Sequence, residues 1–132
     1  MLRLSRRTWL ELVGHCLDGL PLEACGLFGG HPDGRVEVFY PCRNAAASAR
    51  VYEVDPRDHL RADRDAEERG LEIIGVIHSH THTDAYPSPT DIAQAPDPSW
   101  HYVLVSLRDE PVCRSYRILD GNPAEEPVVV DG

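Results

Sequence analysis

The chain has 132 residues, of which 42% are hydrophobic and 27% are charged, as in an ordinary globular domain. Its formal net charge of -9 and its 7% aromatic content argue against binding to nucleic acid or anionic lipid, because phosphates would be repelled and few rings are available to stack on bases. All 13 basic residues are arginines, which excludes a catalytic lysine nucleophile or Schiff base.

Hydrophobic periodicity and turn residues predict strands interleaved with about three helices. Ser5, or alternatively a capping box of Thr8 and Glu11, starts the first helix. Asp55 and Ser88 cap the other two, and each is followed by a proline, which suits the first helical turn. The predicted elements are a helix over 5–18, strands over 23–30, 36–40 and 51–54, a helix over 56–70, a strand over 72–77, a loop over 78–87, a short helix from 88, strands over 102–107 and 112–119, a break at 121–123 and an edge strand over 128–130.

This alternation predicts a single compact α/β domain over residues 1–132, with a central mixed β-sheet flanked by about three helices. The four cysteines form no C-x-x-C pair, and Cys16 and Cys25 lie among apolar neighbours as small core residues. Polar residues interrupt the N-terminal apolar run, so neither a signal peptide nor a membrane span is predicted. A cytoplasmic location with reduced thiols follows as the expectation.

Two histidines stand immediately after an apolar strand. In an extended chain residues i and i+2 point to the same face, so His78 and His80 project together and can bind one metal ion. Alone, such a pair is more typical of solvated loop histidines. Asp91, at the start of the proline-capped helix, offers a third ligand if that helix returns over the strand end. Two histidines and one aspartate with an open fourth position suit catalytic zinc.

The pattern H-S-H-x7-S-x2-D, formed by His78, His80, Ser88 and Asp91, resembles the motif of the JAMM (MPN-plus) metalloprotease family. A strand before the motif and a helix after it agree with that family's layout. The resemblance implies the family's cytidine-deaminase-like α/β fold. It also implies one Zn²⁺ per chain, with His78, His80 and Asp91 as its ligands.

The family also places a glutamate upstream, in a helix-to-strand segment that residues 21–27 resemble, with Glu23 at that position. The resemblance implies that Glu23 takes a proton from the zinc-bound water, whose pKa zinc lowers toward ~7, and delivers it to the leaving amine. It gives Ser88 the role of binding the water and stabilising the oxyanion. Two structural alternatives stay open, in which Glu23 only hydrogen-bonds a turn and Ser88 only caps a helix. The spacing alone does not decide whether Glu23 lies near the metal.

The remaining polar residues near the motif have simpler interpretations. His82 and Asp84 are expected to be solvated loop residues, although a metal or substrate contact by His82 stays open. Ser79 is expected to stabilise the strand end or to support the ligands. The other histidines are expected to be surface or structural residues; they are His15, His31, His59 and His101.

The chain most resembles the small bacterial members of the family, which include a hydrolase that removes cysteine from the C-terminus of a ubiquitin-like sulfur-carrier protein. The resemblance therefore implies cleavage after a C-terminal Gly-Gly in cysteine biosynthesis. Extended tails commonly bind by strand addition, and segment 43–51 is a candidate edge for it. The alternatives are an isopeptidase of ubiquitin-like modifiers and a non-catalytic MPN-type scaffold. A DNA-repair relative is disfavoured by the acidic charge and by the serine between the histidines. The oligomeric state, including a homodimer, is left open.

Overall fold

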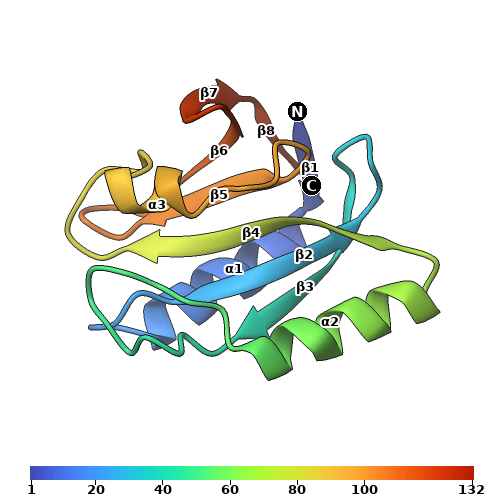
Figure 1. Ribbon diagram of the computed structural model, residues 1–132, viewed down its shortest axis with the longest axis horizontal. Coiled ribbons are helices and arrows are strands. Elements are labelled where there is room, and N and C mark those ends of the chain that lie inside the picture. The colour runs from blue at the N-terminus through green and yellow to red at the C-terminus, as the bar shows by residue number, and fades with distance from the viewer.

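A six-stranded mixed sheet forms the centre of the computed structural model, which describes residues 1–132 (Figure 1). A separate two-stranded sheet and three helices complete the fold. None of the helices is long and apolar enough to cross a membrane. The elements are β1 (Leu2–Ser5), α1 (Arg6–Asp18), β2 (Cys25–Gly30), β3 (Val36–Cys42), α2 (Pro56–Glu68), β4 (Glu72–His80), α3 (Pro89–Ala93), β5 (His101–Ser106), β6 (Val112–Leu119), β7 (Asn122–Glu126) and β8 (Val128–Asp131).

The strand order of the large sheet is β3-β2-β4-β5-β6-β7. Adjacent strands of this sheet are antiparallel, except for β4 and β5, which are parallel and are connected through α3. The predicted mixed sheet flanked by three helices is therefore confirmed. In the small sheet β1 pairs in parallel with β8, so that the two ends of the chain lie side by side (Figure 1).

Two apolar cores lie on opposite faces of the large sheet. Leu12 and Cys16 of α1 pack with Ile77 of β4 on one face. On the other face Ala62 of α2 packs with Val76 of β4. Successive strand residues point to opposite faces, so the even-numbered His78 and His80 share the face of Val76, which is also the face covered by α2 and α3.

The helix starts follow the predicted caps. The Ser5 hydroxyl accepts the Thr8 backbone N–H at 3.1 Å, so Ser5, and not the Thr8 capping box, starts α1. Asp55 accepts the Arg57 N–H at 2.8 Å at the start of α2. Ser88 caps α3, which ends at Ala93, before the prolines that follow.

Three local predictions were wrong, and one strand was missed. β4 continues through His80 instead of ending at 77, because β5 pairs with it as far as His80, while β2 pairs with it as far as His78. Residues 51–54 form a loop, because the Asn44 side chain makes hydrogen bonds with the Val51 carbonyl and the Glu53 N–H, which a strand would need for pairing.

The expected break at 121–123 is instead the start of β7. The turn Asp120-Gly121 has positive φ at both residues, as a tight hairpin requires, and the proline of β7 lies in an edge strand. β1 was not predicted.

Candidate metal centre

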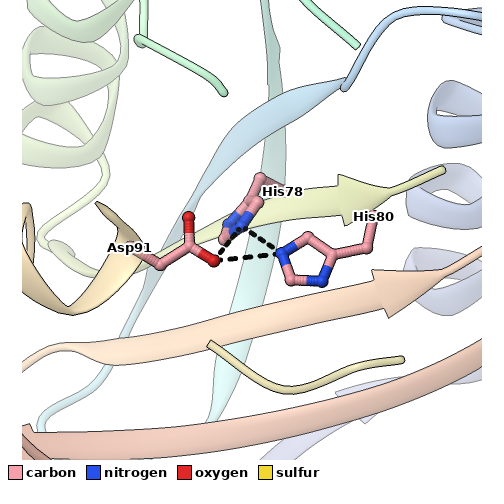
Figure 2. A group of neighbouring side chains, drawn as sticks. All are labelled: His78, His80 and Asp91. Carbon is pink, nitrogen blue, oxygen red and sulfur yellow. Dashed lines mark hydrogen bonds and ion pairs between the residues drawn. The ribbon is translucent and has the colours of Figure 1, made fainter. Parts of the chain in front are cut away.

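Three side chains converge at the C-terminal end of β4 (Figure 2). Nε2 of His78 lies 3.2 Å from Nε2 of His80, and Oδ2 of Asp91 lies 3.2 Å and 3.0 Å from these two atoms, respectively. All three residues are buried. Imidazole nitrogens and a carboxylate oxygen repel one another at such distances unless a proton or a cation lies among them. The donor set is therefore one that a metal ion stabilises, and its composition suits zinc.

Two separate local structures place these ligands. β4 supplies the two histidines from one face of a strand that has neighbours on both sides. Asp91 is held by a capping box, in which the Ser88 hydroxyl accepts the Asp91 N–H at 3.1 Å and Oδ2 of Asp91 accepts the Ser88 N–H at 2.8 Å. The oxygen that completes the helix cap is thus the one that faces both histidines.

The two imidazole rings are themselves fixed. Nδ1 of His80 lies 2.8 Å from the Asp84 carbonyl oxygen, which accepts a hydrogen bond from the Nδ1–H, so that the Nε2 lone pair faces the cluster. The ring of Tyr52 stacks on that of His78 with centroids 4.1 Å apart. Tyr52 belongs to the loop between β3 and α2, and no sequence motif marked it.

Burial and charge adjust the ionisation of the ligands. Burial lowers the pKa of His78 and favours the neutral ring that a metal ligand requires. Burial acts to raise the pKa of Asp91, but the imidazoles of His78 and His80 outweigh it and hold that pKa well below its usual range. The Asp91 carboxylate is therefore negatively charged in the folded protein at neutral pH.

Glu23 lies beside this cluster. Antiparallel pairing places Cys25 opposite His78, and the Ser79 N–H donates to the Ala24 carbonyl at 3.0 Å, so the next residue back along the chain, Glu23, comes level with His80. Oε1 of Glu23 is buried and has no hydrogen-bond partner. Burial raises the pKa of Glu23 to about 7. An unpartnered buried carboxylate oxygen beside three metal-type ligands fits a group that binds a water molecule or its proton.

Hydrogen bonds from both directions fix the chain at Glu23. The Ser79 hydroxyl accepts the Ala24 N–H at 2.9 Å, so Ser79 stabilises the strand end, which was one of its two predicted roles. On the other side, the Glu23 N–H donates to the Ser48 carbonyl at 2.8 Å, and the Asn44 amide donates to the Glu23 carbonyl at 2.9 Å. The backbone of Glu23 is thus held between β4 and the loop that follows β3.

Two cavities flank the cluster. One, of about 530 Å³, is lined mainly by polar residues, among them Glu23, His80 and Ser88. The other, of about 730 Å³, is mainly apolar and includes Tyr52, whose ring stacks on His78, and Trp100. The polar cavity therefore includes one residue of the cluster, His80, whereas the apolar cavity is connected to the cluster only through the Tyr52 ring.

The remaining polar residues are placed largely as expected. His82 and Asp84 are exposed, and neither belongs to the ligand cluster, although His82 lines the polar cavity. His101 is a buried structural residue 2.5 Å from Glu126. Segment 43–51 is not a strand edge, because its Asn44 makes only an isolated bridge with Val54 and the rest is a loop.

Comparison with known proteins identifies relatives that match most of the chain. The model of a family described as prokaryotic homologues of the JAB domain matches residues 5–119. The chain is 44% identical over 123 residues to the CysO-cysteine peptidase of Mycobacterium tuberculosis, covering 90% of this chain and 84% of that protein. It is 35% identical over 102 residues to the desampylase of Haloferax volcanii, covering 73% of each chain. A solution structure of a Desulfitobacterium hafniense protein superposes with a TM-score of 0.91 at 38% identity, over 99% of this chain and 93% of that one.

Proposed function

Because the chain belongs to the family of prokaryotic JAB-domain proteins, we propose that it is a zinc-dependent peptidase acting on a ubiquitin-like sulfur-carrier protein. It hydrolyses the amide bond that follows the carrier's C-terminal Gly-Gly and releases cysteine or a similar adduct. One observation supports this most directly: Glu23, with its unpartnered buried oxygen, lies against a buried cluster of two histidines and an aspartate. The likeness to a CysO-cysteine peptidase supports the choice of substrate.

The proposed ligands are His78, His80 and Asp91, with one Zn²⁺ per chain. A bound zinc ion acidifies water and polarises a carbonyl group. The chain provides three protein ligands, which suits a catalytic site, because a closed structural site would take a fourth. We take residues 1–132 as one catalytic domain. Its four cysteines are unpaired, which agrees with a reducing cytoplasm.

Glu23 acts as general base and then as general acid. Its Oε1 accepts a proton from the attacking water and later delivers that proton to the leaving nitrogen. A carboxylate whose burial raises its pKa to about 7 is suited to both transfers at neutral pH. The Ser48 and Asn44 contacts that fix its backbone hold it in position between the two steps.

Ser88 acts as an oxyanion donor while it caps α3. Its oxygen accepts the Asp91 N–H, which leaves the hydroxyl hydrogen available to the substrate carbonyl. Donors of this kind contribute on the order of 3 kcal/mol to lowering a barrier. The two roles suggested by the sequence are therefore compatible, because the cap uses the lone pair and catalysis uses the hydrogen.

The likeness to a desampylase supports a second candidate, an isopeptidase that removes ubiquitin-like modifiers from proteins. The two candidates share the same chemistry at zinc and differ in the leaving group. A non-catalytic scaffold fits less well, because every position of the metal motif is filled and the side chains converge.

The experiment compares the zinc-loaded wild type with Glu23→Gln. Carrier proteins ending in Gly-Gly-Cys, internal Gly-Gly fusions and di-ubiquitin are incubated with each, and products are identified by mass spectrometry. We expect the wild type to cleave the cysteine adduct. We expect Glu23→Gln to bind zinc equally, with turnover about 10²- to 10⁴-fold lower, the usual contribution of a general base.

Two results would contradict the proposal. Cleavage of di-ubiquitin alone would replace the proposed substrate by the isopeptidase alternative. Full turnover by Glu23→Gln would remove Glu23 as the base.

A further inference from the structure

We propose that Arg50 binds the α-carboxylate of the amino acid that leaves, and so makes the enzyme selective for amino-acid adducts over lysine isopeptides. This assignment rests on the proposed function and adds to it the group that recognises the leaving residue. Arg50 lines the polar cavity together with Glu23 and Ser88. It is the only residue lining that cavity that has a permanent positive charge.

The chemistry of the leaving group favours such a partner. Hydrolysis of a Gly–Cys bond releases an amino acid whose carboxylate lies next to the scissile nitrogen. The two carboxylates of Asp91 and Glu23 would balance the charge of one Zn²⁺, so in a protein of net charge -9 the substrate anion gains from a further cation of its own. A guanidinium is the side chain best matched to a carboxylate, because it donates two parallel hydrogen bonds.

The side chain of Arg50 is uncommitted. It is exposed and forms no ion pair or hydrogen bond with the rest of the chain, unlike Arg108, which pairs with Asp84. Only the Arg50 backbone is engaged, through an N–H that donates to the Ser48 hydroxyl at 3.0 Å. The guanidinium is therefore free to bind a ligand without breaking an internal contact.

The loop that contains Arg50 is nevertheless held firmly against the reaction centre. Ser48, two residues earlier, accepts the Glu23 N–H at 2.8 Å. Ala49 accepts a hydrogen bond from the Thr81 hydroxyl at 3.3 Å, and Thr81 directly follows the ligand His80. In Figure 1 this loop, between β3 and α2, lies at the C-terminal end of β4. Hydrogen bonds of the two residues before Arg50 therefore fix its backbone close to the proposed base, Glu23, and to the proposed ligand His80.

The division between the two cavities sets the direction of the substrate. The apolar cavity by Tyr52 is the larger and suits the carrier's tail. The polar cavity suits a small charged amino acid. An isopeptide substrate would instead place an uncharged lysine stem in the polar cavity, where Arg50 has nothing to pair with.

The test uses two adducts of one carrier protein, made by ligating its Gly-Gly thioester to cysteine or to cysteine amide. The two differ only in the carboxylate. We expect the zinc-loaded wild type to cleave the carboxylate form with a kcat/KM about 10- to 100-fold higher, the usual range for a charge-assisted hydrogen-bonded pair. Arg50→Met should abolish that preference by slowing cleavage of the carboxylate substrate alone. Arg50→Lys, which keeps the positive charge, should keep part of the preference.

Two further measurements separate recognition from general damage. Arg6→Met is the matched control, because Arg6 is exposed on α1, forms no ion pair, and its loss changes the net charge equally. Binding is measured by calorimetry on the inactive Glu23→Gln holoenzyme, with and without Arg50→Met. The carboxylate adduct, and not the amide, should lose affinity.

The outcomes distinguish the two proposals. If the wild type cleaves both adducts equally, or Arg50→Met slows both equally, the assignment of Arg50 is overturned and the proposed function stands. If the wild type cleaves neither adduct, the proposed substrate is overturned and the assignment of Arg50 with it.

Discussion

Replacement of Ser79 by alanine should lower both stability and turnover. Ser79 is fully buried, and its hydroxyl accepts the N–H of Ala24, itself buried, at 2.9 Å. The substitution leaves that N–H without a partner and without access to water. An unsatisfied buried donor costs about 1–3 kcal/mol. At roughly 4 °C per kcal/mol for a domain of this size, Tm should fall by about 4–12 °C.

The effect on turnover follows from the neighbour of Ala24. Glu23 precedes it in the chain, so the lost hydrogen bond loosens the segment that positions the proposed base. Changes in supporting residues of metal sites commonly cost about 10- to 100-fold in activity or metal affinity. We therefore expect kcat at saturating zinc to fall by at least about tenfold, with a smaller change in KM.

Ser115→Ala provides the control. Ser115 is equally buried, and its hydroxyl donates one hydrogen bond to Glu126 at 2.7 Å. It lies on β6, two strands away from β4. The control should lose a similar amount of stability and keep its turnover. Denaturation, zinc content by mass spectrometry and kcat are measured on both variants. If Ser79→Ala keeps a kcat within about twofold of the control, the supporting role of Ser79 in catalysis is refuted.

Two further predictions concern the metal and acid stability. His78→Ala removes one of the three proposed ligands and should reduce the zinc bound to the protein to near zero after dialysis. A chelator should abolish hydrolysis by the wild type until zinc is restored. Hydrolysis that persists without zinc would refute the metal assignment. Burial acts to raise the pKa of Glu126, but hydrogen bonds from His101, the N-terminal amine and Ser115 outweigh it and lower that pKa to about 2. Because the folded pKa lies below the unfolded value of 4.5, the ionised carboxylate stabilises the fold above that value, and on the order of 2–3 kcal/mol should be lost as pH falls from about 4.5 to about 2. Urea denaturation at several pH values should show a loss of unfolding free energy that is larger in the wild type than in Glu126→Gln by this amount; equal losses in the two proteins would contradict the prediction.

Local signals in the sequence predicted most of the fold. Proline after a capping residue set the starts of α2 and α3, and apolar runs located β2, β4 and β5. The failures depend on pairing between distant segments. β1 exists because β8, at the other end of the chain, pairs with it. In the same way β4 extends through His80 because β5, which lies later in the chain, pairs with it as far as that residue. The Asp120-Gly121 hairpin was visible in the sequence, but the proline that follows obscured it.

The site residues likewise fall into those that local spacing predicts and those that only distant contacts bring together. His78 and His80 were predictable together, since alternation along a strand places them on one face. The position of Glu23 was not, because it lies 57 positions before His80 in the chain and only the β2–β4 register brings the two level. Arg50 and Tyr52 gave no signal, because they lie in a loop whose course is fixed by the Asn44 side chain.

The spacing of Ser88 and Asp91 also has a physical explanation that does not depend on any relative. A capping box requires an acceptor three residues after the cap, and Asp91 meets that requirement with the same oxygen that faces both histidines. Moving the aspartate by one residue would break the cap as well as the ligand set. Helix formation therefore fixes Asp91 before any metal binds, which lowers the ordering cost of binding a metal ion at this site.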